Sequence, residues 1–196
     1  MPKRASKKKS LKSLRRTGPV PWLRPALAQR TKDDLVDILV AIAREDRTVL
    51  RRLVTHFELQ MPFKELLAAT RQAMADATAF DERDINHNFS YDYEAYRQVQ
   101  RNLRRLIELK QLRSAMELSL ELMDQGSYQV ELSDEGLMTD DIEACFRPVL
   151  NALQKCDLPA TEVIAWCTAM LKHDRVGFIC EKDLRALREQ LKAQPS

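Results

Sequence analysis

Cysteine, the residue type that serves both zinc sites and covalent catalysis, occurs four times in this chain. The positions are Cys145, Cys156, Cys167 and Cys180. No C-x-x-C pair is present to begin a zinc site or a redox centre. Three of the four recur at intervals of eleven residues, but Cys145 and Cys167 lie within apolar stripes at helical spacing, where a thiol behaves as a small core side chain. We therefore expect reduced, structural cysteines, no metal site and no cofactor.

Histidine, the most frequent general base, offers little more. The positions are His56, His87 and His173. They are distant in sequence and form no i, i+4 metal pair, and no E-x-x-H motif of the kind used in helical bundle enzymes occurs. No catalytic residue is predicted, and we expect a protein that is not an enzyme.

Alternating oxygen side chains between Asp84 and Asp92 imitate the first half of a calcium loop. The sharp turn of such a loop needs glycine where Phe89 stands, and its bidentate glutamate would fall at Ala95. A solvated polar connection is therefore expected here.

The strongest candidate site is a basic N-terminal arm. Residues 1–32 contain eleven Lys or Arg and no Asp or Glu, which leaves 21 basic against 29 acidic residues in 33–196. That part carries about −8, although the whole chain carries +3. The candidate polyanion-binding residues are Lys3, Arg4, Lys7, Lys8, Lys9, Lys12, Arg15 and Arg16. Such side chains bind phosphates by releasing counterions. The alternative is a solubilising tail, or one that folds back on the acidic body.

A second group of basic residues extends this surface more weakly. It consists of Arg97, Arg101, Arg104 and Arg105 on one predicted helix. Glu94 and Glu108 stand at helical spacing from these arginines, which indicates ordinary charge pairing along the helix.

The composition predicts an all-α fold. Glycine occurs only four times, and good helix formers dominate the body. The apolar runs are shorter than the roughly 20 residues that a bilayer requires. No secretory signal is recognised at the N-terminus, so a cytoplasmic protein without a membrane span is expected.

Residues 1–32 are predicted to form a disordered arm that ends in a proline-containing strap. Pro19, Pro21 and Pro25 favour an extended course, and Trp22 and Leu23 offer a means of pinning the strap to the body. The rest, 33–196, is expected to be one helical domain.

The first part of this domain, 33–78, is predicted to be a group of three helices. Thr31 and Asp34 form a capping-box pattern before an apolar stripe that runs from Leu35 to Ile42. A second stripe follows over 49–57, and Pro62 permits a third helix.

The second part, 90–192, resembles a helical repeat. A polar connection over 79–92 precedes a long helix with Leu109 at the end of its inward face, and then a central helix with Gly126 as its stop. Asp140 is a candidate cap for the next helix, and Pro159 precedes another. A last stripe carries Leu184, Leu187 and Leu191. Short connections favour antiparallel helical hairpins stacked as a bundle or short α-solenoid.

This part also resembles a known family. The resemblance rests on four segments, 91–96 (YDYEAY), 103–109 (LRRLIEL), 115–122 (AMELSLEL) and 134–136 (DEG). Over about residues 90–180 they are similar to the helical region that follows the zinc finger of bacterial SWIM zinc-finger proteins. The C-x-C and C-x-H ligands of that finger are absent, and 109–111 (LKQ) stands where the family turn often has glycine. The resemblance implies a helical scaffold without its finger.

The sequence therefore predicts a non-enzymatic helical scaffold that mediates macromolecular interaction, with a protein partner for the body. The alternative is a nucleic-acid-associated protein that binds the phosphate backbone through the arm and the arginine-rich helix.

Overall fold

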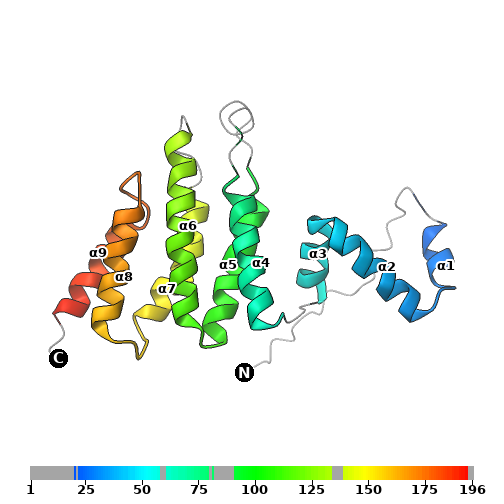
Figure 1. Cartoon of the computed structure of the whole chain (residues 1–196), viewed down its shortest axis with the longest axis horizontal. Coiled ribbons are helices and arrows are strands. Elements are labelled where there is room, and N and C mark those ends of the chain that lie inside the picture. The colour runs from blue at the N-terminus through cyan, green and yellow to red at the C-terminus, as the bar shows by residue number, and fades with distance from the viewer. Residues whose placement is uncertain are drawn as a thin grey trace, which may run out of the picture. The chain divides into compact units, whose positions relative to one another are not determined.

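The computed structural model describes residues 20, 22–57, 61–79, 81, 91–133 and 139–193. Every regular element in these ranges is an α-helix, which confirms the predicted fold class (Figure 1). The chain divides into two compact units, Met1–Gln60 and Met61–Ser196. Within the described ranges, no helix is both long and apolar enough to cross a membrane.

The first unit contains α1 (Leu23–Leu27), α2 (Lys32–Glu45) and α3 (Arg47–Phe57). The predicted capping box at the start of α2 is confirmed, because the main-chain N–H of Asp34 donates to Thr31 Oγ1 at 3.1 Å and that of Thr31 to Asp34 Oδ2 at 3.3 Å. Asp46 separates α2 from α3, and its Oδ1 accepts the N–H of Thr48 at 2.7 Å. Local polar groups thus define both junctions of α2.

The predicted extended strap is wrong in its second half. Leu23–Leu27 forms the short helix α1 with Pro25 in its first turn. Proline is tolerated there because the first N–H groups of a helix have no partner within it. Trp22 is 64% exposed, so it does not pin this segment to a core.

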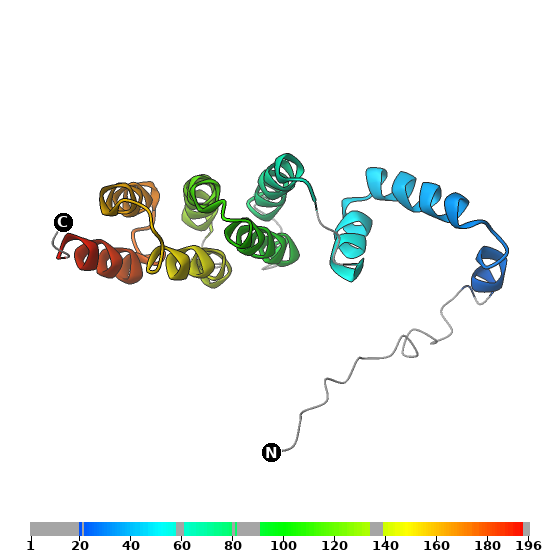
Figure 2. The same cartoon turned by 90° about the horizontal axis from the view of Figure 1, so that it is seen from below.

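The second unit contains α4 (Phe63–Ala77), α5 (Tyr93–Glu108), α6 (Leu112–Leu132), α7 (Thr139–Leu153), α8 (Ala160–His173) and α9 (Glu181–Lys192). Successive helices pair as α4 with α5, α6 with α7 and α8 with α9. Helices α4, α6 and α8 form one layer, and α5, α7 and α9 form the other (Figure 2). The predicted stack of antiparallel hairpins is confirmed. Helix α4 packs on α5 and α6 and so belongs to this unit, whereas the sequence grouped it with the two helices before it.

Helix α6 lies at the centre of the stack, as predicted. It packs against α4, α5, α7 and α8. Leu118, Leu122 and Met123 are almost entirely buried on it. The N–H of the Trp166 indole, on α8, donates to the main-chain carbonyl of Met116 at 2.9 Å. Apolar burial and this buried hydrogen bond together attach α8 to α6.

A buried side-chain amide on α6 attaches α4 and α5. Gln129 is fully buried, and its Oε1 accepts the hydroxyl of Tyr96 on α5 at 2.7 Å. Its Nε2 donates to the carbonyls of Ala77 at 3.0 Å and Ala79 at 3.1 Å, at the end of α4. Carbonyls at a helix end have no partner within the helix, so Gln129 supplies one to α4.

Gly126 was predicted to stop α6, and this is wrong. The helix continues through Gly126 to Leu132. A Cβ at this position would lie 3.0 Å from Cδ1 of Ile142 on α7, closer than van der Waals contact. Glycine therefore serves here to let α6 and α7 approach each other, and packing offsets its low helix propensity.

Two further boundaries differ from the prediction. Helix α7 begins at Thr139, so Asp140 lies in its first turn and is not its cap. Leu109 is exposed because α5 ends just before it in a turn in which Lys110 has a left-handed φ of 58°. The N–H of Gln111 donates to the carbonyl of Leu106 at 2.8 Å, which closes the helix end. The turn thus places lysine at a position that favours glycine.

A proline inside α7 is matched by a side chain from α5. Pro148 has no N–H, so the carbonyl of Ala144, four residues earlier, loses its usual helical partner. The Nε2 of Gln100 donates to that carbonyl at 2.6 Å. Because α5 and α7 lie side by side, the helix that packs on α7 also satisfies the group that the proline leaves open.

Replacing Gln100 with alanine should lower the free energy of unfolding by about 1–2 kcal/mol, because the Ala144 carbonyl then loses its donor. In a Pro148→Ala background the same replacement should cost less, since residue 148 then has an N–H for that carbonyl. Urea denaturation followed by circular dichroism measures both costs. An equal cost in the two backgrounds would contradict this coupling.

Candidate functional site

The predicted polyanion-binding residues of the arm lie outside the described residues. They are Lys3, Arg4, Lys7, Lys8, Lys9, Lys12, Arg15 and Arg16. His87 and most of the calcium-like segment also lie outside them. Asp92, the last residue of that segment, caps α5, because its Oδ1 accepts the N–H of Ala95 at 2.9 Å.

The four predicted arginines of α5 share its outward side. They are Arg97, Arg101, Arg104 and Arg105. The predicted charge pairing is confirmed, with Arg97 3.0 Å from Glu94 and Arg105 2.9 Å from Glu108. Arg97 also lies over the ring of Tyr93, 5.2 Å from its centroid. Pairs this exposed contribute little to stability.

Cys145 and Cys167 lie in the hydrophobic core, as their places in the predicted apolar stripes indicated. Both are fully buried, and Cys180 is nearly so. Burial, with a smaller effect from Asp141, raises the pKa of Cys145 to about 12. Burial also raises the pKa of Cys167 to about 11, and that of Cys180 to about 12 with help from Glu143. These thiols are protonated at neutral pH and lack the thiolate that a nucleophile or metal ligand requires.

Metal-ligating side chains do not gather in the part of the chain that the structure describes. It contains no group of three His, Cys, Asp or Glu placed to hold an ion. His56 lies against the ring of Phe57, and His173 lies 3.6 Å from Asp124. The latter contact belongs to a polar surface that joins three parts of the second unit, α6, the end of α8 and the connection after it.

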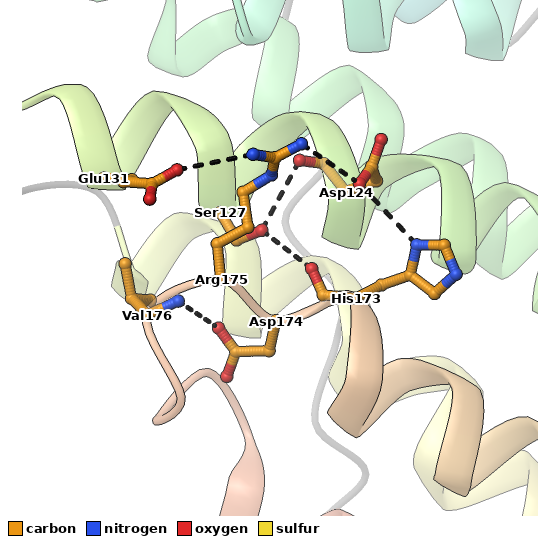
Figure 3. Close-up of polar contacts among 7 residues, drawn as sticks. All are labelled: Asp124, Ser127, Glu131, His173, Asp174, Arg175 and Val176. Atoms are coloured by element: carbon orange, nitrogen blue, oxygen red, sulfur yellow. Dashed lines mark hydrogen bonds and ion pairs between the residues drawn. The ribbon is translucent and has the colours of Figure 1, made fainter.

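That surface is formed where the connection between α8 and α9 meets α6, and we call it the α6 junction (Figure 3). Arg175 lies at its centre. Its guanidinium is 3.8 Å from Oδ1 of Asp124 and 3.5 Å from Oε2 of Glu131. It also covers the ring of Tyr128, 4.9 Å from the centroid, in a cation–π arrangement.

The connection is held in shape by Asp174. Its two carboxylate oxygens accept three main-chain N–H groups, from Val176 at 3.1 Å, Gly177 at 3.0 Å and Ile179 at 2.8 Å. Gly177 has a left-handed φ of 81°, which favours glycine. The D-x-x-G spacing at 174–177 is the local signal for this turn, which was not predicted above.

Serine, histidine and aspartate meet at the junction, but they do not form a catalytic triad. The hydroxyl of Ser127 donates to the main-chain carbonyl of His173 at 3.0 Å, while the imidazole faces Asp124 (Figure 3). A nucleophilic serine needs its hydroxyl directed at the base. The contact instead anchors the end of α8 on α6.

The junction does carry side chains typical of protein interfaces. Tyr128 is 47% exposed on α6, and Phe178 is 53% exposed in the connection that contacts it. Tyrosine and arginine are the residue types enriched among interface hot spots. The arrangement is therefore suited to binding.

Of the four thiols, that of Cys156 should react first with a thiol reagent near pH 8, because it is only half-buried and the other three are buried and protonated. Cys156→Ser should remove the fast phase of thiol labelling.

The buried native thiols also keep protons that unfolded thiols release above their ordinary pKa of 9.0. The free energy of unfolding should therefore fall as the pH rises from 9.0 toward 12. Absorbance labelling kinetics and denaturation at several pH values test both. Fast labelling of Cys145 in the folded protein would contradict the first expectation.

Comparison with protein-family models, curated proteins and solved structures gave no significant match. The resemblance to the helical region of SWIM zinc-finger proteins therefore stays a prediction.

Proposed function

We propose that this protein is a non-enzymatic scaffold that binds a protein partner through its helical body. The supporting observation is the α6 junction, where Arg175 is held between two carboxylates and against the ring of Tyr128 while both side chains stay accessible. Binding normally costs entropy because long side chains become ordered at the interface. Here the contacts with α6 order them beforehand, so a partner that covers the ring meets a prearranged surface.

The junction is also built on rigid elements. Tyr128 lies on the central helix of the stack, and Arg175 follows an aspartate whose carboxylate accepts three N–H groups. A partner with an apolar or aromatic side chain for Tyr128 and an acceptor for Arg175 fits this chemistry.

A quantitative affinity capture tests the proposal with full-length bait. The variant with Tyr128→Ala and Arg175→Ala should retain its partners at least about tenfold less than the wild type, since it loses two hot-spot side chains. Tyr93→Ala is a matched control, because Tyr93 is similarly exposed and also stacks with an arginine, but on α5. Deleting residues 1–18 should leave the partners bound. Equal loss with Tyr93→Ala, or no loss with the double variant, would reject the junction as the binding surface.

The nucleic-acid alternative makes opposite predictions in the same experiment. Binding through the arm should be abolished by deleting 1–18 and should weaken steeply with salt. In the full-length chain, Arg101→Glu combined with Arg104→Glu should also weaken nucleic-acid binding. The Tyr128→Ala, Arg175→Ala variant should have no effect on it. This pattern would replace the scaffold proposal.

A further inference from the structure

Helix α2 exposes an unusual amount of apolar surface. Its side chains Val36, Ile38, Leu39, Val40 and Ile42 are each 40–52% exposed. Only Ala43 is buried on this helix. Leu50 and Phe57 of α3 are likewise exposed, at 46% and 59%. The first unit therefore presents large apolar side chains from both of its long helices.

The distribution of these residues shows that α3 alone cannot cover α2. At about 100° per residue, the positions from Ile38 around to Val40 span an arc of about 200°. A helix that packs on one neighbour usually has an apolar stripe only about half as wide. Helix α2 packs with α3 in this unit, so a substantial part of the arc needs a further partner.

The charges of the two helices indicate what that partner is. Helix α2 carries four carboxylates against two basic side chains, a net charge of −2, and Asp33 and Asp34 lie in its first turn. Helix α3 carries three arginines and no carboxylate, a net charge of +3 without His56. A second α2–α3 hairpin, turned so that each α2 faces the other α3, matches both the apolar surface and the charges.

We propose that two copies of this chain associate through their α2–α3 hairpins as a four-helix, two-fold symmetric dimer. In this arrangement the acidic α2 of one copy lies along the basic α3 of the other, and the exposed apolar side chains of both fill the centre. The inference is independent of the α6 junction. A lipid surface rich in anionic headgroups is a poorer match, because it would attract the arginines of α3 but repel the carboxylates of α2, whereas a second hairpin complements both helices.

Sedimentation equilibrium of the full chain at about 1–100 µM tests the proposal, with twice the chain mass expected for the wild type. Ile38→Asp places a charge in the apolar arc and should raise the dimer dissociation constant at least about 100-fold. The milder Ile38→Ala should raise it about tenfold and guards against loss of the helix itself. Circular dichroism checks that each variant keeps its helices.

Ala41→Asp is the matched control, because Ala41 is exposed on the same helix but lies outside the apolar arc. It should remain dimeric, as should the chain without residues 1–18. A monomeric wild type at about 100 µM would refute the proposal. So would dimerisation that survives Ile38→Asp, or that Ala41→Asp weakens equally. The proposal would also be refuted if the chain stayed monomeric and bound a different protein through α2 and α3.

Discussion

The side-chain amide of Gln129 sets how the first three helices of the stack meet. A buried amide left without partners costs about 1–3 kcal/mol for each open group. Gln129 is satisfied only if the Tyr96 hydroxyl and the carbonyls of Ala77 and Ala79 converge on it. Shifting α4 or α5 along α6 would break these bonds, whereas leucine contacts would re-form in a new place. The amide thus fixes a register that apolar packing alone leaves loose.

Much of the fold could be predicted from short-range sequence patterns at the helix ends. Thr31 and Asp34 start α2, and prolines 62 and 159 stand directly before α4 and α8. These effects involve residues within one turn of each other, so no tertiary knowledge is needed. Gly126 was misjudged because glycine has two uses, ending a helix and admitting a neighbour, and only the position of Ile142 decides between them. The same applies to Trp22, because its sequence neighbours do not show whether another part of the chain covers it.

The site was less predictable than the fold for the same reason. Pairing of Arg97 with Glu94 follows from their spacing on one helix. The α6 junction joins Asp124 to Arg175, which are far apart in sequence and meet only because the α8–α9 connection folds back on α6. Its local part, the turn at 174–177, could have been recognised from the aspartate and the glycine. On α2 an apolar stripe was predicted, but the wider apolar arc and its exposure were not.

The joints between the hairpins differ from one another. On one side α6 is attached to α4 by the Gln129 amide and the Arg71–Glu121 ion pair, and on the other to α8 by Trp166 and Arg113–Glu162. Repeat proteins change length by gaining or losing interchangeable units. Removing or duplicating one hairpin here would bring unlike joints together and leave buried polar groups open. Despite their repeated architecture, the hairpins of this stack are therefore not interchangeable.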